Sequence, residues 1–189
     1  MYFLFLNFLV AFVTIVSQDI NSSYFCKKVV MKHVSLASIE KAVEIVDHLT
    51  DDQLENISEK YALVQQDLLN YVMTAPAEYE NEDLEGLLIY YFCVISECFT
   101  QEGIKLRAVT EADIDEIEEP YFDMLEQYFD EEDEEIIESF CDQPFLYQFM
   151  EMEVSTEDED GSKLDEETAT QLFIVTMAMI SLMNRAIID

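Results

Sequence analysis

The 189-residue chain is poor in the residues that form turns and catalytic sites: it has three glycines, three prolines, two histidines and no tryptophan. So few turn-forming residues disfavour a β-rich fold and favour long helices. Three glycines cannot build a glycine-rich phosphate loop, and no P-loop, GxGxxG, GxSxG or HExxH motif occurs. A nucleophile would have to recruit His33 or His48, so we predict a protein that is not an enzyme and has no cofactor.

Basic residues are equally scarce. The chain has nine Lys and Arg and 42 Asp and Glu, which gives a formal net charge of −33. Such a surface repels nucleic acid phosphates and anionic membranes, and it attracts cations and basic protein surfaces. We therefore expect a basic protein surface as the partner and no direct binding of nucleic acid.

The four cysteines, Cys26, Cys93, Cys98 and Cys141, form no CxxC pair. A zinc site would need closer ligand spacing and histidine partners. We expect buried, reduced thiols in a cytosolic protein, and no metal site at these residues.

Hydrophobic residues, by contrast, make up 50% of the chain, including 13 Phe, 10 Tyr and 9 Met, so the chain can build a core. Residues 1–30 stand apart, because residues 1–18 are uncharged and almost wholly apolar while residues 31–189 hold 41 of the 42 acids. Three interpretations of this apolar leader stay open: translation that starts at Met31, a signal peptide without a positive n-region, or a membrane anchor of minimal length. We expect residues 31–189 to form one acidic cytoplasmic domain, with export or anchoring through residues 1–18 as the alternatives; the oligomeric state is left open.

Helical periodicity dominates residues 38–184 and predicts an all-α bundle of six to eight helices. The first three expected helices cover residues 38–49, residues 50–71, which open with a Thr50–Gln53 capping box, and residues 84–99, which Gly103 closes. An acidic helix starts at Thr110 and restarts at Pro120. A short helix around residues 136–140, a helix from Pro144 and a buried helix over residues 168–184 follow. Residues 57–96 and 138–181 each run from an amphipathic segment through an acidic connector to an apolar helix that ends Ile-Ser. This echo suggests two similar helical hairpins packed through their apolar second helices, and shared amphipathic periodicity is the plain alternative.

The stretch TEDEDGSKLDEE, residues 156–167, partly matches a calcium-binding EF-hand loop. Asp158, Asp160, Gly161 and Glu167 stand at loop positions 3, 5, 6 and 12. However, Thr156 replaces the first carboxylate, and Lys163 puts a cation at position 8. We therefore predict a solvated connector in which Asp165 caps the last helix, and no metal site.

The densest acidic segment, residues 111–138, has 15 acids in 28 residues. We predict that it docks on a basic surface of a partner protein, with aromatic side chains as anchors. Two alternatives are a nucleic-acid mimic that occupies a DNA-binding protein, and an acidic soluble protein with no charge-specific partner. The predicted contact residues are Glu111, Asp115, Glu118, Glu119, Tyr121, Tyr128, Phe129, Glu131, Glu132, Glu134 and Glu135.

Overall fold

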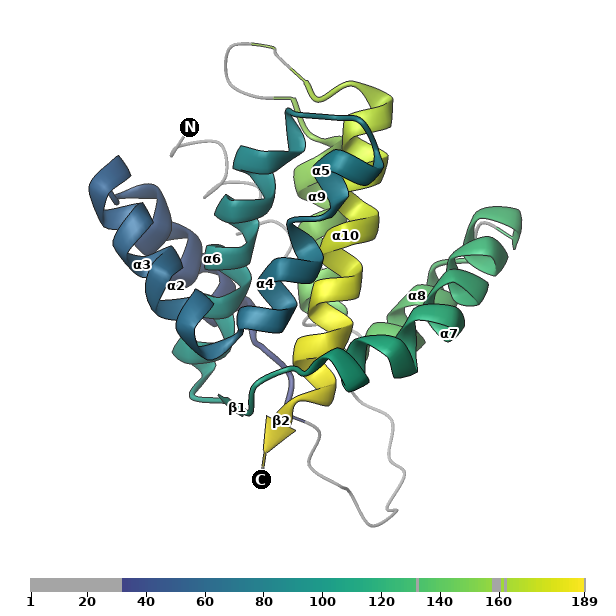
Figure 1. Cartoon of the computed structure of the whole chain (residues 1–189). Helices are drawn as coiled ribbons and strands as arrows, with labels where there is room; N and C mark the ends of the chain where they lie inside the picture. The colour runs from purple at the N-terminus through teal and green to yellow at the C-terminus, as the bar shows by residue number, and fades with distance from the viewer. Residues whose placement is uncertain (1–31, 132, 158–160, 162, 189) are drawn as a thin grey trace. The chain divides into compact units, whose positions relative to one another are not determined.

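A computed structural model describes residues 32–131, 133–157, 161 and 163–188 (Figure 1). These residues form eight helices of seven or more residues, one single-turn helix and one pair of two-residue strands, which confirms the predicted all-α fold. The helices are α2 (Leu36–Asp47), α3 (Asp51–Val64), α4 (Gln66–Val72), α5 (Ala75–Glu78), α6 (Leu84–Glu102), α7 (Glu111–Glu131), α8 (Glu134–Cys141), α9 (Pro144–Ser155) and α10 (Glu166–Arg185). The predicted leader lies outside the described residues.

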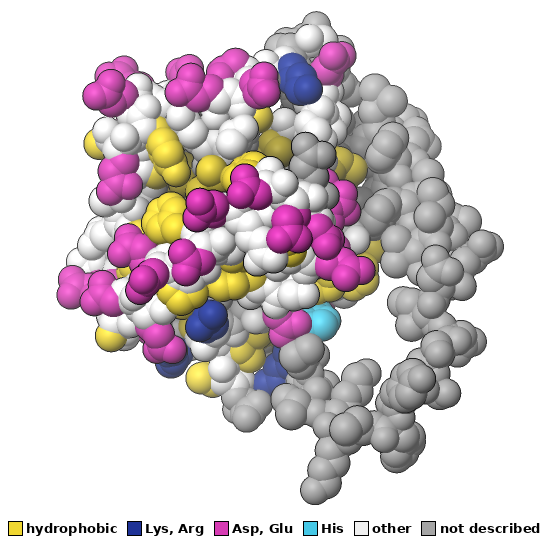
Figure 2. All heavy atoms as spheres, turned by 90° about the vertical axis from the view of Figure 1, so that its right-hand side faces the viewer, with side chains coloured by type: hydrophobic (Ala, Val, Ile, Leu, Met, Phe, Trp, Pro, Cys, Tyr) yellow, Lys and Arg dark blue, Asp and Glu magenta, His cyan; other side chains and the backbone are white. Residues whose placement is uncertain are grey.

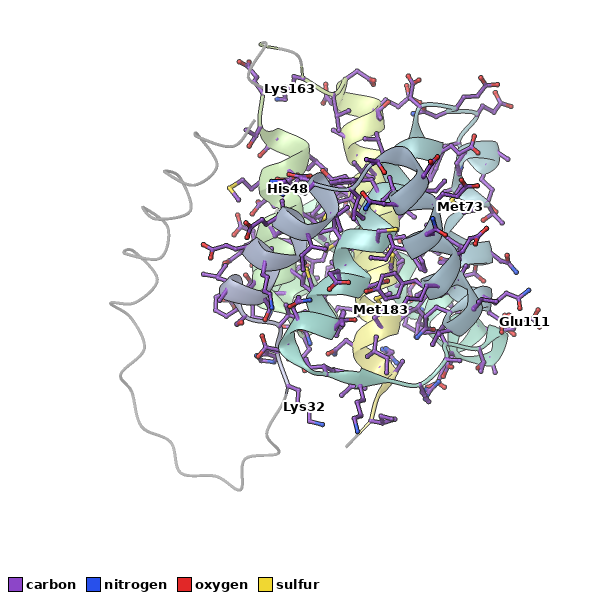
Figure 3. The ribbon with its side chains drawn as sticks, turned by 90° about the vertical axis from the view of Figure 1, so that its left-hand side faces the viewer. Lys32, His48, Met73, Glu111, Lys163 and Met183 are labelled. Atoms are coloured by element: carbon purple, nitrogen blue, oxygen red, sulfur yellow. The ribbon has the colours of Figure 1, made fainter. Side chains whose placement is uncertain are left out.

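The core is built around α6 and α10, which pack against each other. Both are apolar over most of their length, so both bury side chains on several faces, among them Phe92 of α6 and Met183 of α10. Met183 is labelled in Figure 3. Helices α2 and α3 cover α6, while α8 and α9 cover α10. Each large apolar side chain buried in this way contributes about 1.5–3 kcal/mol relative to its exposed state. The prediction that residues 84–99 and 168–184 form core helices is confirmed.

Three predicted helix ends are also confirmed. The Thr50–Gln53 capping box opens α3, and Gly103 ends α6 with a φ of 73°, a left-handed conformation that glycine adopts without strain. Asp165 opens α10, because its carboxylate accepts from the backbone N–H of Thr168 at 3.0 Å. Of residues 156–167, which we predicted to be a solvated connector, residues 158–160 and 162 lie outside the described residues.

The helix predicted over residues 50–71 is wrong as a single element. It breaks at Gln65, whose φ of −127° and ψ of 47° end α3 and begin α4. The Gln65 side chain is buried and bridges the chain before α7: its amide donates to the Arg107 carbonyl at 2.9 Å and accepts from the Val109 N–H at 2.8 Å. These long-range hydrogen bonds hold a bend that local periodicity does not reveal.

The predicted restart at Pro120 is also wrong, since α7 continues through this residue. Proline removes one backbone hydrogen bond and usually kinks a helix. Here Ile117 and Tyr121 flank Pro120 and are both buried on one face, so packing on the core holds the two halves in one helix.

Two short strands join distant parts of the chain. Strand β1 (Lys105–Leu106) pairs antiparallel with β2 (Ile187–Ile188), and the Arg107 N–H donates to the Ala186 carbonyl at 2.9 Å. This pairing fixes the segment that leads into α7 beside the end of α10. In the described part of the chain, no helix has both the length and the apolar character needed to cross a membrane.

Candidate functional site: the acidic hairpin

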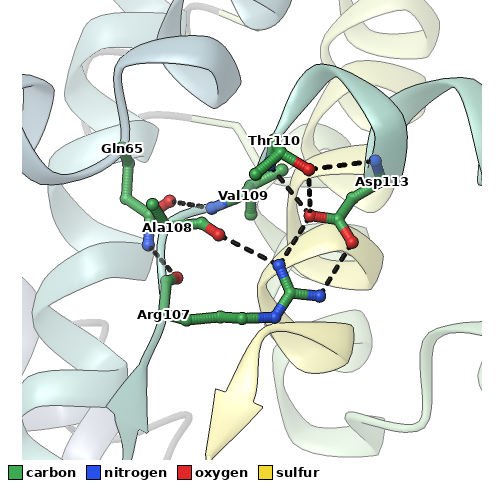
Figure 4. A network of polar contacts seen from close by, with 6 residues as sticks. All are labelled: Gln65, Arg107, Ala108, Val109, Thr110 and Asp113. Atoms are coloured by element: carbon green, nitrogen blue, oxygen red, sulfur yellow. Dashed lines mark hydrogen bonds and ion pairs between the residues drawn. The ribbon is translucent and has the colours of Figure 1, made fainter.

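Helices α7 and α8 pack side by side and contain the predicted contact residues other than Glu132 (Figure 1). We call them together the acidic hairpin, residues 111–141. Its start is fixed by a polar network around Arg107 (Figure 4). Arg107 donates from both terminal nitrogens to the Asp113 carboxylate, at 2.6 and 2.7 Å, and Thr110 donates its backbone N–H to Asp113 at 2.9 Å.

The network has an electrostatic consequence. Hydrogen bonds from the Arg107 guanidinium and from Thr110 hold the pKa of Asp113 well below its usual range. Asp113 is thus ionised and paired at any pH at which the protein is expected to work. Its carboxylate holds the first turn of α7, so it is not a free surface charge.

The start of α8 is also fixed by residues that are neighbours in the chain. Asp133 lies at the N-cap of α8 and accepts from the Glu135 N–H at 3.0 Å. Glu134 and Glu135 follow in the first turn, where the helix dipole favours negative charge. These acids therefore stabilise the helix and remain exposed at the same time.

Most of the predicted contact residues do lie at the surface. The structure leaves these eight exposed: Glu111, Asp115, Glu118, Glu119, Phe129, Glu131, Glu134 and Glu135. Figure 3 shows Glu111 at the edge of the molecule, extended outward. Tyr128 is half-buried, and Glu132 lies outside the described residues.

Tyr121 must be removed from the predicted face. It is only 1% exposed, and its hydroxyl donates to the Ile174 carbonyl on α10. It stands four residues after Ile117 and four before Leu125, so it shares the buried stripe of α7. A tyrosine in this stripe packs in the core and cannot reach a partner.

Phe122 is the exposed aromatic residue that the sequence reasoning missed. It is 51% exposed, and Phe129, seven residues later on the same face, is 50% exposed. The signal was present: seven-residue spacing places both rings on one face of α7, and Phe122 falls outside the buried stripe. Phe122 and Phe129 are therefore the aromatic side chains of α7 that are most accessible.

No basic side chain is built into this segment. Residues 108–162 contain no Lys, Arg or His over 55 positions. Within the described part of the chain, Arg107–Asp113 is the ion pair that reaches α7 or α8. Among the described residues, Arg107 pairs with Asp113 and the Arg185 guanidinium lies over the Phe140 ring, while most other acids of the hairpin face solvent.

An open groove of about 700 Å³ lies between α7 and α8. Its apolar lining includes Met124 and Phe140, and its acidic lining is Asp123, Asp133 and Glu135. The remaining lining residues are Pro120, Gln127, Ile136 and Ser139. Figure 2 faces this side of the molecule and shows acidic side chains around exposed hydrophobic ones.

Two acids outside the acidic hairpin, Glu97 and Glu102, have partners and serve the fold. Glu97, buried in α6, accepts from the Tyr61 hydroxyl and from the Gln101 amide. Glu102 accepts from the Ser35 N–H at 2.8 Å and from the Ser38 hydroxyl at 2.7 Å, and so it joins the end of α6 to the start of α2. These carboxylates are buried or satisfied, unlike those of the acidic hairpin.

The described cysteines are free and buried, as predicted, and lack the features of nucleophiles. Burial raises the pKa of the Cys93 and Cys141 thiols to about 11, and that of Cys98 further. All three are protonated near neutral pH, and the thiolate is the reactive form. Among the described residues, no three His, Cys, Asp or Glu side chains are grouped so that they could hold a metal ion.

Comparison with known proteins gives no relative: no family model, curated protein or solved structure matches this chain. Function is therefore argued from the geometry of the acidic hairpin.

Proposed function

We propose that the protein is a non-catalytic binding protein whose acidic hairpin docks on a basic surface of a protein partner. The observation that carries the proposal is the concentration of exposed acids on α7 and α8, in a 55-residue stretch without one basic residue. Charge of one sign steers a partner of opposite sign and raises the association rate. We further propose that it acts in the cytoplasm.

Exposed aromatic residues complement the charge. Phe122 and Phe129 lie about half exposed among the acids of α7. Aromatic side chains are typical anchors of protein interfaces, since their burial on binding slows dissociation. Charge for association and apolar area for dissociation together describe a protein-binding face.

The test compares two charge reversals of equal size. In the first variant Asp115, Glu119 and Glu131 are changed to Lys on α7. In the control, Glu44, Glu55 and Glu59 are changed to Lys on α2 and α3, where they are also exposed. Both variants shift the net charge by the same amount, so any difference between them reports the position of the charge.

Native host lysate is passed over the immobilised wild type and both variants at low salt, and retained proteins are identified and then measured kinetically. We expect a basic protein that binds the wild type and the control, with association slowed several-fold by the α7 reversal and by added salt. The Debye length is about 8 Å at physiological ionic strength, so exposed charges are screened there. Equal binding to both variants, or retention of nothing basic, would refute the proposal.

Duplex DNA added to the complex distinguishes the mimic hypothesis. If the retained protein binds DNA and duplex DNA displaces it competitively, the acidic hairpin imitates phosphates. If DNA leaves the complex intact, the partner is recognised as a protein surface.

A further inference from the structure

The groove between α7 and α8 has the spacing of a helix-binding site. Pro120, Met124 and Gln127 line it from α7 at positions i, i+4 and i+7, and Ile136, Ser139 and Phe140 line it from α8 at i, i+3 and i+4. Each helix thus presents one continuous stripe. At 1.5 Å per residue, the α7 stripe is about 10 Å long, which matches two turns of an opposing helix.

Two helices packed side by side leave room for a third along the seam between them. A helix in such a seam contacts both stripes through its own i, i+3 and i+4 side chains, which is the common mode of helix-in-groove recognition. Met124 is buried, while Ile136 and Phe140 are half-buried, so apolar area remains for an occupant to cover.

Charge decides which helix fits. The groove carries Asp123, Asp133 and Glu135 and no basic residue. A second copy of the chain would bring the same charges and be repelled, and an uncharged segment such as residues 1–18 would pair with none of them. A helix with Lys or Arg beside its apolar stripe satisfies both the apolar and the acidic lining.

The chain itself shows that the aromatic lining accepts a cation. The guanidinium carbon of Arg185, at the end of α10, lies 5.5 Å from the centre of the Phe140 ring. A cation at this distance is attracted to the ring face.

We infer that the α7–α8 groove binds one amphipathic helix of the partner, with an apolar stripe on the groove and Lys or Arg beside the carboxylates. The inference rests on the proposed function and narrows it from a basic surface to a basic helical segment. It differs in one measurable respect: general electrostatic docking depends on composition alone, whereas helix-in-groove binding depends on the order of residues.

The probes are three labelled synthetic peptides of 16 residues, titrated into the full-length protein. The first has Leu at i, i+3, i+4 and i+7 spacing and Lys or Arg elsewhere; the second is a scramble of the same composition; the third keeps the Leu stripe with Glu for each basic residue. Fluorescence anisotropy measures affinity, and circular dichroism measures helix gained on mixing. We expect one-to-one binding of the first peptide at least tenfold tighter than the scramble, with a gain of helix, and no binding of the acidic peptide.

A matched pair of variants locates the binding. Ser139→Arg puts a large cation into the groove, and Ser155→Arg adds the same charge at the exposed end of α9. Both serines are exposed, so both variants should fold. We expect Ser139→Arg to lower the affinity for the first peptide at least tenfold and Ser155→Arg to lower it less than twofold. The affinity for the scrambled peptide should change equally in both variants.

Each alternative outcome overturns the inference in a distinct way. Equal affinity for the amphipathic and scrambled peptides would agree with general electrostatic docking and would show that the groove does not bind an amphipathic helix selectively. Equal effects of the two arginine variants would place the binding elsewhere. A dimer in sedimentation that Ser139→Arg dissociates would assign the groove to a second copy. If no basic peptide binds at low salt, the inference is also refuted. The lysate test decides the proposed function separately.

Discussion

Helices α6 and α7 have similar lengths, 19 and 21 residues, and nearly opposite roles. Eleven residues of α6 are buried, against four of α7. The one acid buried in α6, Glu97, has hydrogen-bond partners, whereas most acids of α7 face water. The comparison teaches that an acid's role depends on what surrounds it: a partnered carboxylate helps to hold the fold, and an exposed one is free to meet another molecule.

The largest expected difference between the two helices comes from removing a ring. Phe92→Ala in α6 empties a site with 0% exposure and should cost about 3–5 kcal/mol of unfolding free energy. Phe122→Ala in α7 removes a ring that is 51% exposed and should cost less than about 1 kcal/mol, because little is vacated. Urea unfolding followed by circular dichroism measures both. Similar losses would show that α7 belongs to the core as much as α6 does.

The next prediction concerns the buried acid. Tyr61→Phe removes a donor to Glu97 and leaves the carboxyl short of a partner, which should cost about 1.5–3 kcal/mol. Tyr79→Phe is the matched control, because its hydroxyl makes no hydrogen bond within the described part of the chain. Equal unfolding midpoints in urea for the two variants would mean that Glu97 does not depend on Tyr61.

A smaller effect separates two acids that are both near water. Glu102→Ala removes the acceptor of Ser35 and Ser38 and should destabilise the fold by about 1–2 kcal/mol. Glu118→Ala, on the exposed side of α7, should change stability by no more than about 0.5 kcal/mol. Thermal melts of the two variants test this, and a large loss for Glu118→Ala would show that the acids of α7 are structural.

The smallest expected effect depends on pH. Burial, with Glu134 and Glu138 nearby, raises the pKa of Glu151 on α9. A raised pKa means that its stabilising contribution is present below the ordinary value of about 4.3 and is lost as pH rises through the folded-state value. Glu151→Gln should therefore stabilise the fold slightly at pH 7, and the gain should vanish near pH 4. Melts across this range provide the measurement, with the exposed Glu126→Gln as control.

The structure also predicts where the pH response reverses. Asp113 has a lowered pKa, so its contribution is present above the ordinary value of about 3.9 and is lost as pH falls below it. In the wild type, stability should rise from pH 7 towards pH 5 as repulsion among acids weakens, and fall in stronger acid. A steady decline from pH 7 downward would contradict this.

Several features followed from the sequence alone because their causes are local. Helical periodicity and scarce glycine determine an all-α fold, and apolar composition determines that residues 84–99 and 168–184 lie in the core. Caps such as Asp165 and Gly103 depend on a few neighbouring residues, so they too could be predicted. The acidity of residues 111–138 is likewise a property of the sequence.

Other features were decided by contacts between distant residues. The break at Gln65 exists because its side chain bridges Arg107 and Val109, more than 40 positions away. The buried hydroxyl of Tyr121 finds its acceptor, the Ile174 carbonyl, only on α10, while Phe122, its neighbour in the chain, is left outside. The groove exists only once α7 and α8 pack together. The sequence determined how much acid and aromatic surface there is, and the tertiary structure decided which side chains it leaves for a partner, because burial depends on residues that periodicity cannot pair.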